Sequence, residues 1–76
     1  MIKEHERIVL KVDIPGEGLE AGDVGTVVHI YRDGRAYEVE FITLAGQTAA
    51  VVTVEAADVR PVEKREITHA RNLQAA

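Results

Sequence analysis

The chain has 76 residues and a formal net charge of −4, and 46% of its residues are hydrophobic but only 4% aromatic. This length allows one domain with a thin core, and the absence of cysteine excludes disulfides and thiolate metal sites. Serine is also absent, which leaves neither a serine nor a cysteine nucleophile, and the acidic balance argues against a general polyanion binder.

The N-terminal part predicts one strand and one loop. Residues 7–12 place Ile8, Leu10 and Val12 at a spacing of two, which is typical of a half-buried strand. Residues 13–23 hold three glycines, one proline and four acidic residues without a basic one, a composition that predicts a long loop. We expect Ile14 and Leu19 to hold this loop against the core. No stretch approaches the about 18 apolar residues of a membrane span, and we expect a cytoplasmic protein.

Residues 24–31 and 36–42 predict a hairpin around Asp33-Gly34, a pair that suits a two-residue turn with positive φ at both positions. That turn sets a register in which one face is largely apolar and the other mixed. The predicted core-facing pairs are Ile30 with Tyr37, Val28 with Val39, and Thr26 with Phe41. The predicted outer pairs are His29 with Glu38, Val27 with Glu40, and Tyr31 with Ala36.

A further strand is predicted at 49–54, after a turn near 44–47. Either a two-residue Ala45-Gly46 loop or a three-residue loop with a bulge at Gly46 fits this turn. Residues 55–58 suit a single 3₁₀ turn, and 59–62 a short closing strand in which Pro61 requires an edge position. This order predicts an all-β fold, a small SH3-like, partly open barrel of about five strands over residues 1–62.

Residues 63–76 form a predicted tail with a different composition. Ile67, Ala70 and either Leu73 or Gln74 give a faint helical spacing, but isolated helices of this length are marginal in water. Two predictions therefore stand for the tail, which is either disordered or helical on a partner.

Three strings, at 21–28, 36–41 and 55–62, resemble a family of small bacterial proteins catalogued as a domain of unknown function, number 4926. The resemblance covers about residues 2–62 and implies an SH3-like barrel. More distantly, the Gly-Asp-Val-Gly-Thr-Val string at 22–27 is similar to other SH3-like barrels, including the KOW modules and the small docking subunits of nitrile hydratase and photosystem I. Several of these distant relatives are accessory proteins rather than catalysts, and the resemblance to the 4926 family implies an antitoxin-like role.

The chemistry-bearing residues give no enzyme or metal pattern. His29 faces Glu38 in the predicted register, but we interpret them as a surface pair because no nucleophile or pocket accompanies them. Neighbours in Glu4-His5-Glu6 point to opposite sides of an extended chain, and the acids of the 13–23 loop do not match an EF-hand. We therefore expect no catalysis, no cofactor and no metal.

The predicted function is a non-catalytic interaction module that binds another protein or a second copy of itself. An exposed apolar patch often marks such a contact. The residues predicted to form the interface are Val27, Tyr31, Ala49, Val51, Ile67 and Leu73. The alternative is KOW-like RNA or DNA binding at the hairpin tip, where Tyr31, Arg32 and Arg35 combine a stacking face with two cations.

Overall fold

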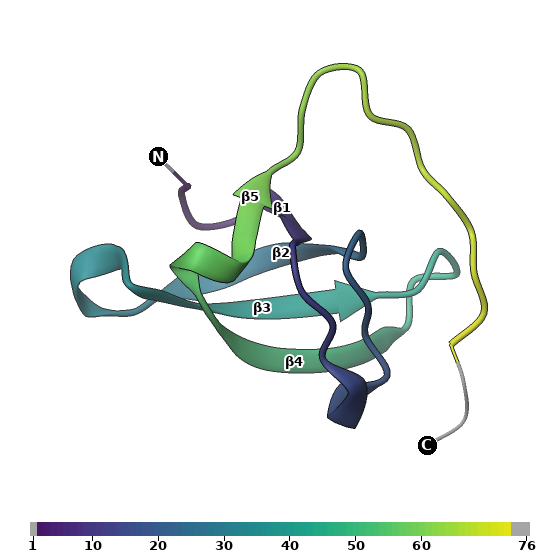
Figure 1. Cartoon of the computed structure of the whole chain (residues 1–76), viewed down its shortest axis with the longest axis horizontal. Coiled ribbons are helices and arrows are strands. Elements are labelled where there is room, and N and C mark those ends of the chain that lie inside the picture. The colour runs from purple at the N-terminus through teal and green to yellow at the C-terminus, as the bar shows by residue number, and fades with distance from the viewer. Residues whose placement is uncertain (1, 74–76) are drawn as a thin grey trace.

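The computed structural model describes residues 2–73 as one open, five-stranded antiparallel sheet with no α-helix in that range. The strand order is β4-β3-β2-β1-β5, and short 3₁₀ segments occupy the connections (Figure 1). The strands are β1 (Arg7–Leu10), β2 (Val24–Ile30), β3 (Ala36–Ile42), β4 (Thr48–Glu55) and β5 (Val59–Pro61), and the 3₁₀ segments are η1 (Pro15–Glu17), η2 (Arg32–Gly34) and η3 (Ala56–Asp58). The predicted all-β class and element order are confirmed, and the sheet is consistent with a small, partly open barrel.

β1 is more deeply buried than its alternation predicts. Ile8 and Leu10 are buried as expected, but Val9 between them is buried too, and Val12 lies beyond the strand and is exposed. β1 is an interior strand of the sheet, with β2 hydrogen-bonded to one of its edges and β5 to the other. The 13–23 loop is held as predicted, since Leu19 is buried and pairs with Ile14, which packs against the core.

The β2–β3 hairpin keeps the predicted pairs only near its tip. Ile30 lies opposite Tyr37 and His29 opposite Glu38. Asp33 and Gly34 both have positive φ, as predicted, but η2 widens the loop beyond two residues. Past the tip a β-bulge at Val28 shifts the register by one residue, so that Val27 pairs with Val39.

This bulge corrects two sequence predictions. Val27, predicted on the outer face, is 0% exposed, whereas Val28, predicted in the core, is 38% exposed. The reason is that β2 pairs with β1 at its start and with β3 along the rest of its length. The extra residue bends the strand between the two partners, so that Gly25 and Val27 are buried before the bulge and Ile30 packs against the core after it.

The β3–β4 hairpin matches the predicted strand register. Tyr37 pairs with Val54, Val39 with Val52 and Phe41 with Ala50. The loop is the three-residue alternative, because the Thr43 N–H donates to the Gln47 carbonyl and Gly46 has a φ of 92°. A bulge at Ala49, between the Phe41–Ala50 and Ile42–Thr48 pairs, then restores the register that a two-residue loop would set.

The most deeply buried side chains of the core are Ile8, Leu10, Val27 and Val39. Gly25 allows β2 to lie close to β3, since a Cβ there would lie 2.5 Å from Val39 Cγ1 and 2.8 Å from Phe41 Cε1. Pro61, which has no N–H to donate, lies on the edge strand β5 as predicted.

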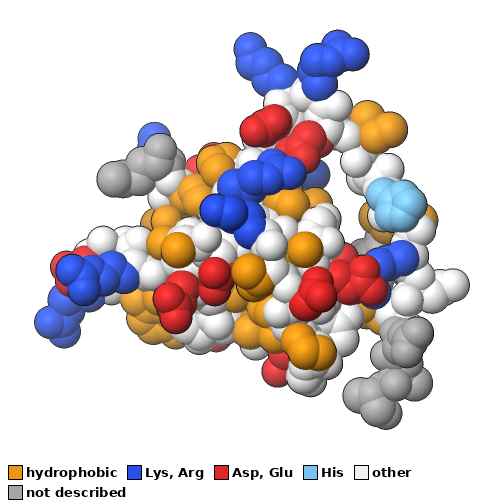
Figure 2. Space-filling model, in the orientation of Figure 1, with side chains coloured by type: hydrophobic (Ala, Val, Ile, Leu, Met, Phe, Trp, Pro, Cys, Tyr) orange, Lys and Arg blue, Asp and Glu red, His pale blue; other side chains and the backbone are white. Residues whose placement is uncertain are grey.

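Residues 62–73, here called the arm, leave β5 and arch away from the sheet without regular structure (Figure 1). The helix favoured by the spacing of Ile67, Ala70 and Leu73 is therefore absent from this part of the chain. A helix formed on a partner stays a prediction, and residues 74–76 of the predicted tail lie outside the described range. Basic side chains project from the top of the arm and from the β2–β3 hairpin tip (Figure 2).

Candidate functional site

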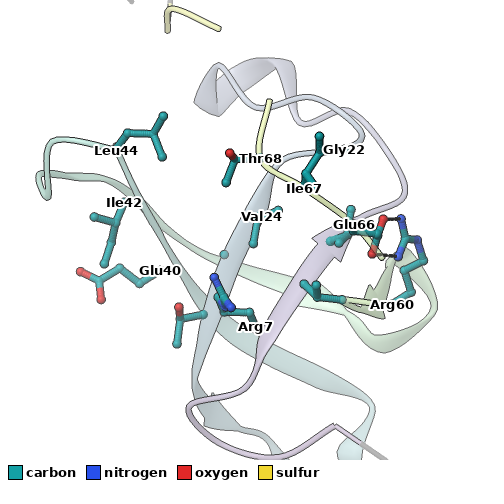
Figure 3. Close-up of a pocket in the computed structure, with 14 residues that line it drawn as sticks. Arg7, Gly22, Val24, Glu40, Ile42, Leu44, Arg60, Glu66, Ile67 and Thr68 are labelled. Carbon is teal, nitrogen blue, oxygen red and sulfur yellow. Dashed lines mark hydrogen bonds and ion pairs between the residues drawn. The ribbon is translucent and has the colours of Figure 1, made fainter. Parts of the chain in front are cut away.

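An open groove lies between the arm and the barrel. It has a volume of about 360 Å³ and is lined by the start of β2, the end of β3 and the first half of the arm. Its apolar wall includes Val24, Ile42 and Leu44 on the barrel side, with Ile67 on the arm (Figure 3). All four are exposed, and Leu44 and Ile67 retain 78% and 92% of their accessible surface. A small domain thus leaves four large aliphatic side chains in contact with water at one place.

The first half of the arm is fixed by an ion pair between Arg60 of β5 and Glu66. The guanidinium donates Nη1–H to Glu66 Oε1 at 2.9 Å and Nη2–H to Oε2 at 2.6 Å (Figure 3). The Glu63 N–H also donates to Oε1, at 2.7 Å. Hydrogen bonds from Arg60, followed by the Glu63 N–H, lower the pKa of the Glu66 carboxyl to about 2.

The second half of the arm is fixed by Arg71. Its guanidinium donates Nε–H to Asp23 Oδ1 at 3.0 Å and Nη2–H to Oδ2, and Nη2–H also reaches the Gly18 carbonyl at 3.1 Å. Glu20 Oε2 lies 3.5 Å from Nη1. Burial alone raises the pKa of Asp23, but hydrogen bonds from Arg71 and from the Glu20 N–H, with the Arg71 charge, place it below its ordinary value. The acidic loop thus receives its cation from the arm.

A polar cluster covers the outer face of the sheet near the hairpin tip. Glu38 Oε1 accepts hydrogen bonds from the Thr53 hydroxyl at 2.6 Å and the Tyr31 hydroxyl at 2.9 Å. These two bonds, that of Thr53 first, lower the pKa of Glu38. The His29 ring stands edge-on to Tyr31 at 4.7 Å, and its Nδ1 lies 3.9 Å from Glu4 Oε2. All of these side chains are solvent-accessible, which is the geometry of a surface network.

The hairpin tip of the nucleic-acid alternative is partly engaged by this cluster. Tyr31 donates its hydroxyl to Glu38 and packs against His29, while Arg32 and Arg35 are exposed. A carboxylate at the Tyr31 hydroxyl repels phosphate, because like charges at close range cost free energy. The hairpin tip therefore offers a nucleic acid the ring of Tyr31 and the charges of Arg32 and Arg35, with the carboxylate of Glu38 beside them.

The six residues predicted to form a protein interface do not form one patch. The prediction for Val27 is wrong, because this side chain is buried in the core. Tyr31 lies at the hairpin-tip end of the sheet, and Val51 is exposed in the middle of β4 opposite Glu40. The remaining three, Ala49, Ile67 and Leu73, line a second, more open groove of about 870 Å³ beneath the distal arm.

The sequence does not predict the barrel side of the groove, formed by Val24, Ile42 and Leu44, or the two arginine–carboxylate pairs that hold the arm. Val24 and Ile42 stand at strand ends, where alternation does not decide which face is covered. A signal for the arm was present, because a loop with four acids and no base favours a cation from elsewhere in the chain. Arg71 is that cation.

The described residues, 2–73, hold no group of three or more His, Asp or Glu side chains placed to bind a metal ion. Within the same range no helix is long and apolar enough to cross a membrane. No polar or charged side chain is buried in this part of the chain. The features that stand out are the exposed groove and the arm.

Comparison with known proteins identifies the family and nothing closer. Searches of curated proteins and of solved structures both find no match. One family model matches, over residues 4–61, which covers all five strands and stops before the arm. On this match, the chain belongs to the family described as Domain of unknown function (DUF4926).

Proposed function

We propose that this protein is a non-catalytic interaction module that binds another protein in the groove between its arm and the ends of β2 and β3. The observation that carries the proposal is the exposure of Leu44 and Ile67 on either side of that groove. Contiguous apolar surface of this kind is characteristic of a contact site. The lack of serine and cysteine nucleophiles supports a binding role over a catalytic one.

Charge indicates the kind of partner. The chain carries −4 overall. Asp23 and Glu20 are already paired with Arg71, and the carboxylate that lines the groove itself outside the two arm ion pairs is that of Glu40. A complementary surface would present an aliphatic side chain flanked by lysine or arginine. The partner is therefore a protein segment that is apolar at its centre and basic at its rim.

The experiment is capture from a lysate of the source organism with three baits, which are the wild type, Leu44→Glu and Val28→Glu. Val28, like Leu44, is an exposed aliphatic residue, but it lies in the β2 bulge away from the groove. We expect a protein retained by the wild type and Val28→Glu but lost by Leu44→Glu. Burial of a leucine contributes about 1.5–3 kcal/mol, so the purified partner should bind Leu44→Glu at least about tenfold more weakly.

Two results would contradict the proposal. One is capture that does not depend on Leu44. The other is capture that nuclease treatment of the lysate abolishes, which would support the nucleic-acid alternative through Tyr31, Arg32 and Arg35.

A further inference from the structure

β4 forms one edge of the sheet, and among the described residues its only paired neighbour is β3. Backbone groups of an antiparallel strand point alternately to its two sides. At the start of β3, the Arg35 carbonyl points toward β4 and accepts the Ala56 N–H. The next carbonyl, that of Ala36, points toward β2 and accepts the Tyr31 N–H. By this alternation the carbonyls of Tyr37, Val39 and Phe41 also point toward β4. Their partners in β4, which are Val54, Val52 and Ala50, therefore direct their backbone groups toward β3.

Val51 and Thr53 consequently direct their N–H and C=O groups outward. No backbone hydrogen bond from the described loops and turns reaches either residue. The middle of β4 therefore offers two donors and two acceptors to solvent, arranged as the edge of an antiparallel ladder.

This edge lacks the usual protection against pairing. Residues 48–54, Thr-Ala-Ala-Val-Val-Thr-Val, include no charge and no proline. The opposite edge, β5, has three residues, one of them charged and one proline, which are devices that discourage strand addition. The bulge at Ala49 interrupts β4 at its hairpin end but leaves residues 50–54 regular.

We propose that β4 pairs antiparallel with β4 of a second copy, joining the two sheets across a twofold axis. Of the registers that place outward-facing residues opposite each other, two pair Val51 with a residue of the regular segment 50–54, which is either Val51 or Thr53 of the second copy. In both registers the two Val51 side chains are direct or diagonal neighbours on the same face. This surface is distinct from the groove, so the inference does not rest on the proposed function.

The side chains at this edge are compatible with self-pairing. Val51 is 51% exposed, and pairing would cover it with its own copy. Glu55, the one charge on β4, would lie opposite Gln47 in the first register and Ala49 in the second, so no carboxylate faces another. An edge contact of about six residues is smaller than a standard interface, and we expect a weak dimer.

The first test is sedimentation velocity of the full chain from about 10 μM to about 1 mM. We expect a concentration-dependent dimer for the wild type and at least about a tenfold weaker dimer for Val51→Lys. A lysine at 51 would lie opposite Glu40, which preserves the fold. Val28→Lys, the same change at an exposed position off the edge, should leave the dimer unchanged.

A mixture of two oppositely charged variants tests whether residue 51 lies next to residue 51 of the second copy. Val51→Lys and Val51→Glu should each dimerise at least about tenfold more weakly than the wild type, while their equimolar mixture should form a tighter heterodimer because residue 51 meets its own copy. A wild type that stays monomeric at about 1 mM, or a dimer that Val51→Lys and Val28→Lys weaken equally, would overturn the proposal.

The absence of native cysteine allows a test of register. Paired Cα atoms lie about 4.5–5.5 Å apart, within the range that a disulfide spans. In the first register Val51→Cys alone should oxidise to a disulfide dimer. In the second, only a mixture of Val51→Cys and Thr53→Cys should do so. If neither forms a disulfide faster than a Val28→Cys control, the β4 edges do not meet.

Discussion

Arg71 and Asp23, 48 positions apart in the chain, form an ion pair with two hydrogen bonds that joins the end of the arm to the start of β2. Both side chains are largely withdrawn from solvent, with 23% and 19% of their surface exposed. Paired arginine and carboxylate groups in this forked geometry are the stronger kind of ion pair. The arm is thus fixed at both ends, at Glu66 and at Arg71, while Ile67 between them is in water.

We expect Arg71→Gln to release the distal arm without unfolding the barrel. Glutamine removes the charge and the fork that hold Asp23, but Asp23 keeps the backbone hydrogen bond that its carbonyl accepts from the Leu10 N–H, and no core side chain is changed. Backbone ¹⁵N relaxation should show residues 67–73 becoming mobile on the nanosecond timescale, with little change in the melting temperature. Arg65→Gln, an exposed arginine of the same arm, is the control and should leave the relaxation unchanged. An arm that stays ordered in Arg71→Gln would show that other contacts hold it.

The proximal attachment of the arm should be sensitive to strong acid. Arg60 and the Glu63 N–H lower the pKa of Glu66 from 4.5 to about 2. A carboxyl whose folded-state pKa is depressed stabilises the attachment fully above its unfolded pKa, and that contribution is lost as the pH falls through the folded pKa. The arm should therefore stay attached at pH 4.5 and loosen as the pH approaches about 2.

The measurement is a pH titration of the Glu66 carboxyl by ¹³C NMR. In Arg60→Gln the pKa of Glu66 should rise toward the ordinary glutamate value, because its largest stabilising hydrogen bonds are removed. A Glu66 pKa that Arg60→Gln leaves unchanged would contradict the assignment.

The sequence predicts the strands and their order well, because alternation and turn residues are local signals. Asp33-Gly34 and Gly46 mark both hairpins, and the Phe41–Ala50 register follows from them. What it does not predict is the bulge at Val28, since Val27 and Val28 are chemically identical neighbours. Only the requirement that β2 pair with β1 as well as β3 decides which of them is buried.

The arm could not be placed for a related reason. Its attachments, Arg60 to Glu66 and Arg71 to Asp23, are charge pairs whose partners the sequence offers in several combinations. The exposure of Val24, Ile42 and Leu44 depends on where the arm runs, and so the groove was not predictable either.

The two adjacent valines test the bulge directly. Val27→Ala removes two methyl groups from a fully buried side chain and should lower the free energy of unfolding by about 1.5–3 kcal/mol. Val28→Ala, at an exposed position, should change it by less than about 0.5 kcal/mol. Urea denaturation of both variants measures the difference. Equal costs, or a larger cost at Val28, would mean that β2 follows the unbulged register.

Gly25 should be the least replaceable glycine of the chain. An alanine Cβ there would lie 2.5 Å from Val39 and 2.8 Å from Phe41, both of them buried. Because the core cannot move aside without strain, we expect Gly25→Ala to lower the free energy of unfolding by about 1–3 kcal/mol. Gly16→Ala is the matched control, since nothing lies within 4 Å of its added Cβ and its φ is not positive. It should be neutral or stabilising by up to about 1 kcal/mol through loss of unfolded-state entropy, and a Gly25→Ala as stable as Gly16→Ala would show that β2 and β3 are not in this close contact.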